Sequence, residues 1–190
     1  MSLLDTLITP LGRLLKNRRA GLQHSVRRAP ELAAETAIDF GSNSFAPGAT
    51  IPDRHAFTGR GPNVSPELHW GILPTGTKQL LLVVEDIDVP MAQPGLHLVA
   101  LFPPTITGFA EGFLTADNPD VRYVPTRKGR IGYVGPRALP GHGQHHYGFH
   151  LYALDAVVGN STAASSFADV LPLFAGHVLA GGFLEGTQTA

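Results

Sequence analysis

The chain has 190 residues, of which 43% are hydrophobic and 15% charged, and its formal net charge is −1. This length and composition fit one globular domain with a buried core, and they exclude a charge-rich disordered chain and a globally basic nucleic-acid-binding protein. The 22 glycines and 16 prolines favour short strands and tight turns over a helical bundle, and the lack of cysteine excludes disulfides, thiolate zinc sites and cysteine nucleophiles.

Residues 1–36 differ in character from the rest, because they hold six basic and three acidic side chains. Apolar residues recur at helical spacing from Leu3 to Leu15, which predicts an amphipathic helix that Pro10 should kink or divide. Such a helix can pack on the domain, on a second copy as a homodimer contact, or on a membrane surface. We therefore expect a helical extension and linker over 1–36 and the main domain over 37–190.

The beginning of the chain does not resemble a secretory signal, because no basic residue precedes its apolar part. No apolar run reaches the roughly 18 residues that span a bilayer, so no integral membrane segment is expected. These two observations predict a cytoplasmic protein.

Strand-like segments and turns alternate from Ala37 onward. Two short, continuous apolar runs are typical of strands that are buried on both faces. The predicted strands are 38–40, 79–85, 96–102, 130–134 and 147–154. By contrast, residues 59–66 hold too many glycines and prolines for a regular element.

The C-terminal part is predicted to be helical. Ser165 or Ser166 can cap a short helix that runs through Leu171, and Pro172 ends this helix or begins a second one that continues through Leu179. The expected fold class is therefore mainly β, with helices at both ends of the chain.

An acidic cluster ends the first apolar run, where Glu85, Asp86 and Asp88 lie within four positions. Three carboxylates would repel one another if all were buried and ionised. The cluster is therefore either a loop of turn-forming acids or the edge of a polar cleft in which donors hold some of the carboxylates. The second apolar run contains His97, which is either a core histidine bonded to the backbone or a functional imidazole.

A histidine-rich stretch covers residues 141–150. If a strand begins near His145, side-chain alternation places His145 and Tyr147 on one face and His146 and His150 on the other. His146 and His150 would be about 13 Å apart at a rise of ~3.3 Å per residue, too far to share one metal ion. No metal site is expected, since no zinc-binding helix motif is present either.

The sequence lacks the motifs of several enzyme classes. It contains no phosphate-binding loop, no dinucleotide fingerprint and no serine nucleophile elbow. We therefore expect no cofactor and no catalytic residue.

Four stretches follow one another in the chain: GPNVSPELHW over 61–70, DIDVP over 86–90, YVGP with PGHG and HHY over 133–147, and HVLA over 177–180. Together they resemble the phosphatidylethanolamine-binding protein family, and in particular its bacterial Raf-kinase-inhibitor-like branch. The resemblance extends over about residues 37–188.

The resemblance implies a Greek-key β-sandwich with a C-terminal helix and a small anion-binding pocket at one end. The positions that match the family's pocket are Asp86, His97, Gly135, Pro136, His145 and Tyr147. Such a pocket would bind a phosphate or carboxylate headgroup, and more tightly as the pH falls through about 6.5, the ordinary pKa of histidine.

The function implied is that of a non-enzymatic ligand-binding protein that modulates a kinase or protease. Two alternatives are a small hydrolase that uses Asp86 and His97 as acid and base, and a protein-interaction module with a vestigial pocket. The chain departs from the family where Ile87 replaces a proline, where His146 replaces an arginine, and where Gln188 aligns with a pocket tyrosine. The Val89–Pro90 peptide bond is a candidate for the cis form.

Overall fold

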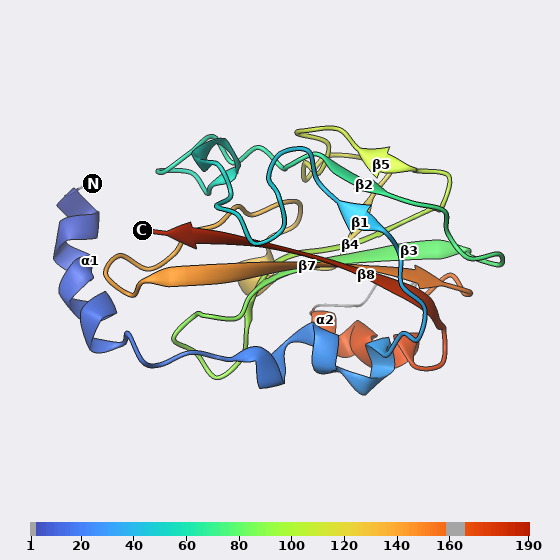
Figure 1. The fold of residues 1–190 in the computed structure, drawn as a ribbon, viewed down its shortest axis with the longest axis horizontal. Coiled ribbons are helices and arrows are strands. Elements are labelled where there is room, and N and C mark those ends of the chain that lie inside the picture. The colour runs from blue at the N-terminus through green and yellow to red at the C-terminus, as the bar shows by residue number, and fades with distance from the viewer. Residues whose placement is uncertain (1–2, 159–165) are drawn as a thin grey trace.

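Two β-sheets dominate the computed structural model, which describes residues 3–158 and 166–190 (Figure 1). All strand pairings within the two sheets are antiparallel. The larger sheet has the order β6 (Arg122–Tyr123), β4 (Gly95–Phe102), β3 (Gln79–Asp86), β7 (Gln144–Leu154) and β8 (Val178–Thr189). The smaller sheet has the order β1 (Phe40–Gly41), β2 (Leu68–Trp70) and β5 (Gly108–Phe109).

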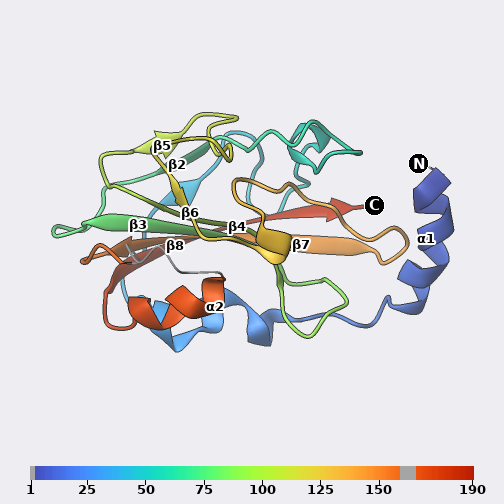
Figure 2. The ribbon, with the colours of Figure 1, turned by 180° about the vertical axis from the view of Figure 1, so that it is seen from behind.

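The helices are few and lie outside the sheets. Helix α1 (Leu3–Leu14) stands at one end of the molecule, whereas α2 (Phe167–Val170) lies below the larger sheet with the turns that follow α1 (Figures 1 and 2). Single turns of 3-10 helix lie at Leu22–His24, Val26–Arg28, Pro30–Leu32, Asp53–His55, Arg127–Gly129 and Leu171–Phe174. None of the helices in the described part of the chain is long and apolar enough to cross a bilayer.

The five-stranded sheet separates two hydrophobic cores. On β3, Leu80, Leu82 and Val84 face the smaller sheet, whereas Leu81 and Val83 face α2 and the N-terminal turns. We call these the inner and outer faces of the sheet. A strand that is buried on both faces must be apolar at consecutive positions, so the strands predicted over 79–85 and 96–102 are confirmed.

The predicted second C-terminal helix is wrong, because residues 178–189 form strand β8 along the whole length of β7. Glycines explain the difference. A Cβ at Gly182 would lie 2.7 Å from the Cβ of Phe40, and one at Gly186 would lie 2.5 Å from Ile51, so the segment before β2 packs directly on the backbone of β8. The short helix capped by Ser166 is confirmed as α2, while Ser165 lies outside the described residues.

Three local expectations also differ from the structure. Residues 130–134 form no strand, because Tyr133 and Val134 donate to different segments, at Leu114 and His97, instead of one ladder. Helix α1 continues through Pro10 without division. All peptide bonds of the described residues are trans, including Val89–Pro90. The Greek-key connectivity and the division of the chain at residue 36 remain predictions.

Candidate functional site

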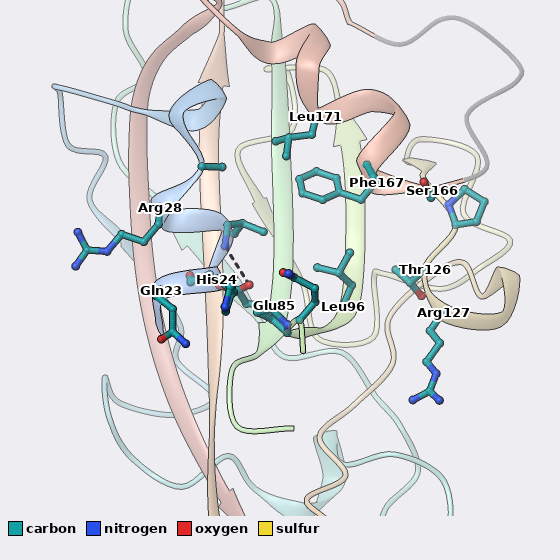
Figure 3. Close-up of a pocket in the computed structure, with 17 residues that line it drawn as sticks. Gln23, His24, Arg28, Glu85, Leu96, Thr126, Arg127, Ser166, Phe167 and Leu171 are labelled. Atoms are coloured by element: carbon teal, nitrogen blue, oxygen red, sulfur yellow. Dashed lines mark hydrogen bonds between the residues drawn. The ribbon is translucent and has the colours of Figure 1, made fainter. Parts of the chain in front are cut away.

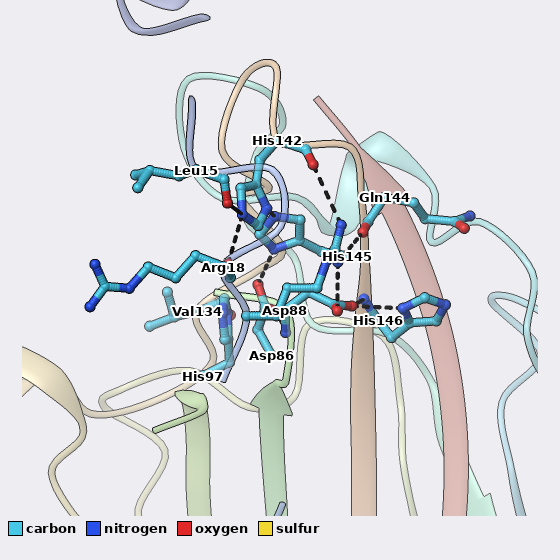
Figure 4. Close-up of polar contacts among 11 residues, drawn as sticks. Leu15, Arg18, Asp86, Asp88, His97, Val134, His142, Gln144, His145 and His146 are labelled. Atoms are coloured by element: carbon cyan, nitrogen blue, oxygen red, sulfur yellow. Dashed lines mark hydrogen bonds and ion pairs between the residues drawn. The ribbon is translucent and has the colours of Figure 1, made fainter. Parts of the chain in front are cut away.

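Strands β3, β4 and β7 bring Asp86, His97 and His145 together at one end of the larger sheet (Figure 4). Asp86 is the last residue of β3 and pairs in register with Tyr147 on β7. His145 precedes Tyr147 by two positions, so both side chains point to the inner face. His97 lies on β4, and its ring meets the Tyr147 ring edge-on with centroids 5.2 Å apart.

A chain of hydrogen bonds runs through two buried imidazoles. Nδ1 of His145 lies 2.7 Å from Oδ2 of Asp86, and its Nε2 lies 2.8 Å from Nδ1 of His142. Nε2 of His142 in turn lies 2.9 Å from the carbonyl oxygen of Leu15 and 3.0 Å from that of Arg18. The side chains of Asp86 and His145 are each only 1% exposed.

The acceptors in this series of hydrogen bonds determine how many hydrogens its side chains carry. Carbonyl oxygens only accept hydrogen bonds, so Nε2 of His142 must carry a hydrogen. One hydrogen is needed between the two rings, and another between His145 and Asp86. Three hydrogens on two imidazoles and one carboxylate leave the group with no net charge, which makes its burial tolerable.

His97 is not bonded to Asp86. Its Nδ1 lies 2.7 Å from the carbonyl oxygen of Val134, to which it donates. Burial lowers the pKa of His97 below 6.5, although the nearby Asp86 carboxylate opposes the shift. The imidazole that pairs with Asp86 is therefore His145, and not the His97 that the hydrolase alternative requires.

The Tyr147 hydroxyl is buried and makes no hydrogen bond of normal geometry with the described residues, although the Asp86 side chain and the Arg137 backbone lie close enough to influence its pKa. Burial raises the pKa of Tyr147 well above its ordinary value of 10, and the Asp86 carboxylate adds to this shift. The phenol is therefore neutral and has a hydrogen to donate.

Gln188 is a site residue that the sequence argument did not select. It pairs with His145 across β7 and β8, and cross-strand partners point to the same face. Its side chain is buried, and neither its amide oxygen nor its amide nitrogen has a partner in the described part of the chain. The sequence contained a signal, because the family places a tyrosine at this position.

Gly135 and Pro136 lie beside the candidate site, and the GPNVSPELHW motif over 61–70 fixes their position. The side chain of Asn63 accepts from the Gly135 amide at 2.7 Å and donates to the Tyr133 carbonyl at 3.0 Å. A Cβ at Gly135 would lie 2.1 Å from the carbonyl oxygen of His55, so only glycine fits there. This motif therefore has a structural role.

The acidic cluster is divided between two faces. Asp88 lies near the site and pairs with Arg19 at 2.6 Å and with Nδ1 of His146 at 2.7 Å. Burial alone would raise the pKa of Asp88, but the hydrogen bonds from Arg19 and His146 outweigh it and hold the pKa below 3.8. Glu85 instead points to the outer face, where it bonds with His150 at 2.9 Å.

Residues 15–21 cross this end of the sheet, and we call them the cover segment. Besides the two carbonyl oxygens on His142, the segment donates from the Ala20 amide to Val89 and from the Gly21 amide to Ile87. Helix α1 rests on the loop before β7, where a Cβ at Gly12 would lie 1.9 Å from the carbonyl oxygen of Pro140. The predicted site residues thus lie together beneath the cover segment.

No group of three side chains suited to hold a metal ion exists among the residues that the structure describes. His146 and His150 point to the outer face, and their imidazoles bond to Asp88 and Glu85 respectively.

Because the pKa of His97 is lowered in the folded protein, the free energy of unfolding should depend on pH. Unfolded chains bind a proton at this residue near pH 6.5 whereas the folded chain resists it, so the free energy of unfolding falls as the pH drops below about 6.5. We expect His97→Asn, which keeps a donor for Val134, to lose less stability than the unchanged chain between about pH 7.5 and pH 5.5. Denaturant titrations at both pH values measure this. Equal losses in the two proteins would contradict the assignment.

Comparison with known proteins supports the sequence resemblance. A family model described as phosphatidylethanolamine-binding protein matches residues 41–189. UPF0098 protein PH1269 of Pyrococcus horikoshii is 34% identical over 160 residues, which cover 82% of this chain and 76% of that protein. UPF0098 protein YbhB of Escherichia coli is 37% identical over 123 residues, which cover 60% and 76%.

Two solved structures share the fold. The phosphatidylethanolamine-binding protein homologue CT736 of Chlamydia trachomatis superposes with a TM-score of 0.68 at 28% identity. Escherichia coli YbcL, described as a member of the mammalian family, superposes with a TM-score of 0.74 at 24% identity and supports the fold alone. Each alignment covers 82% of this chain and 99% of the other.

Proposed function

Because this chain belongs to the phosphatidylethanolamine-binding protein family, we propose that it is a non-enzymatic protein that binds a phosphate- or carboxylate-bearing small molecule at the covered site. The observation that carries this proposal is the pair of buried polar groups without a protein partner, the Tyr147 hydroxyl and the Gln188 amide. Leaving buried polar groups unpaired costs about 1–3 kcal/mol each, and a bound oxyanion would relieve that cost.

Each group has a distinct role in this proposal. The Tyr147 hydroxyl and the Gln188 amide nitrogen donate to oxygen atoms of the guest. His97 already donates through Nδ1 to Val134, and it donates through Nε2 once protonated, so anions bind more tightly as the pH falls. Asp86 orients His145 and can accept from an ammonium group on the guest.

A bound small molecule must displace contacts that the protein already makes at this site. His142 occupies the second nitrogen of His145, and the cover segment holds His142 through two carbonyl oxygens. We infer that binding requires His142 and the cover segment to move away, and that the measured affinity is reduced by the fraction of molecules in which they stay closed.

Calorimetric titration with O-phosphorylethanolamine and with acetate tests the proposal. We expect Tyr147→Phe to weaken binding about fivefold, since one hydrogen bond contributes about 1 kcal/mol. Tyr123→Phe is a matched control, because the Tyr123 hydroxyl is also buried without a partner but lies on β6. Equal effects of the two substitutions, or no binding by the unchanged chain, would refute the site.

We also propose a cytoplasmic role in modulating a kinase or protease. If His145→Ala abolishes anion binding while a partner protein still binds, the chain is instead an interaction module with a vestigial pocket.

A homodimer is proposed through α1, because Leu7 and Leu14 are 78% and 81% exposed and lie with Leu11 on one stripe. Light scattering that finds the full chain monomeric would exclude the dimer.

A further inference from the structure

A cavity lies on the outer face of the larger sheet, away from the covered site (Figure 3). Its volume is about 570 Å³, which is within the range of roughly 300–1,000 Å³ that small-molecule sites occupy. Most of its walls come from the N-terminal extension between residues 23 and 29, from residues 93–96 at the start of β4, from residues 125–127, and from α2 with the turn after it. Because residues 23–29 precede the family match over 41–189, the cavity depends on a segment outside that match.

Most of the lining surface is apolar, although polar side chains such as Gln23, His24 and Gln93 also contribute to it. Val26 comes from the extension, Leu96 from β4, and Phe167 and Leu171 from α2 and the turn after it. Figure 3 shows Leu96 and Phe167 on one side of the cavity and the extension on the other. An apolar chain or ring that entered here would exchange water for carbon contacts on several sides.

The one carboxylate of the lining is unable to attract a cation. Glu85 is fully buried and accepts from the Ser25 hydroxyl and from the Val26 amide, the latter at 3.1 Å. Nε2 of His150 lies 2.9 Å from the same carboxylate. With three donors already in place, Glu85 serves the fold and presents no free charge to the cavity.

The free charges at the rim are positive. Arg28 and Arg127 both line the cavity and are exposed, and neither forms an ion pair within the described residues. Arg127 makes a weak donation to Sδ of Met91 at 3.4 Å. In Figure 3 the two arginines lie on opposite sides of the other lining residues, with their guanidinium groups extending outward.

We propose that this cavity binds a fatty acid, with the alkyl chain between Leu96, Phe167 and Val26 and the carboxylate at the arginine rim. An apolar lining, a cationic rim and a volume suited to one small amphiphile favour this class over sugars, nucleotides and organic cations. The inference is independent of the oxyanion site, since the two sites lie on opposite faces of the sheet.

Calorimetric titration of the full chain with decanoate, decanol and decyltrimethylammonium tests the class of ligand. We expect decanoate to bind at least tenfold more tightly than decyltrimethylammonium. The double substitution of Arg28→Gln with Arg127→Gln should weaken decanoate at least fivefold and leave decanol unchanged. Lys78→Gln is the matched control, because it removes an exposed cation from the opposite end of β3 and should change nothing.

Two further variants test the position of the site. Ala168 lines the cavity from α2 and is exposed, so Ala168→Trp should fill the space and abolish decanoate binding without unfolding the chain, which a melting curve verifies. In His145→Ala, which should lose acetate binding at the covered site, decanoate should still bind and should still be weakened at least fivefold by the two arginine substitutions. The proposal is overturned if decanoate does not bind, if the cationic amphiphile binds equally well, if Ala168→Trp has no effect, or if His145→Ala removes binding.

Discussion

Replacing Gly12 by alanine will raise the affinity of the chain for O-phosphorylethanolamine about tenfold. The added Cβ would lie 1.9 Å from the carbonyl oxygen of Pro140, so helix α1 and the loop before β7 must separate. The cover segment then loses its support over His142. A tenfold gain corresponds to about 1.4 kcal/mol, the scale of one or two weak contacts.

The choice of alanine makes this prediction specific. Alanine stabilises a helix interior by about 1 kcal/mol relative to glycine, so a gain in affinity would not reflect loss of the helix. Leu11→Ala is the matched control, because Leu11 is exposed on the same helix next to Gly12. Calorimetric titration measures both variants. If Gly12→Ala binds no more tightly than Leu11→Ala, the cover segment does not regulate access.

Replacing Glu85 by alanine will lower the free energy of unfolding by at least about 3 kcal/mol, since each buried donor left without its acceptor costs about 1–3 kcal/mol. The substitution leaves Nε2 of His150, the Ser25 hydroxyl and the Val26 amide without their acceptor. Since Ser25 and Val26 belong to the extension, residues 22–32 should also lose their attachment to β3.

Chemical denaturation measures this loss, and an exposed pair provides the control. Glu111 pairs with Arg54 at the surface, where an ion pair is worth about 0.5 kcal/mol, so Glu111→Ala should have little effect. Hydrogen exchange should report faster opening of residues 22–32 in Glu85→Ala. A loss of stability no greater than that of Glu111→Ala would contradict the role assigned to Glu85.

The part of the fold that the sequence predicts best is the pair of central strands. Consecutive apolar residues over 79–85 and 96–102 have one main explanation, burial on both faces of a sheet. Strand β8 was misjudged because its glycines and its HVLA stretch conceal a period of two, in which Ala180 and Leu184 are buried and Phe183 is exposed. The close approach of Phe40 and Ile51 that requires those glycines is a long-range contact without a local signal.

The residues of the candidate site also fall into two groups, those that the sequence predicts and those that it does not. Motifs and strand alternation select Asp86, His145 and Tyr147, because those residues lie on strands whose direction the sequence predicts. The parts that the sequence did not indicate depend on distant segments. His142 bonds to residues more than 120 positions earlier, and Gln188 reaches the site only through the register of β7 and β8.

A crystal structure of Gly12→Ala soaked in phosphate tests the central proposal most directly. The account predicts a phosphate within hydrogen-bonding distance of the Tyr147 hydroxyl and the Gln188 amide, with Nδ1 of His142 no longer bonded to His145. A cleft filled by side chains, or a phosphate bound only elsewhere on the molecule, would contradict it.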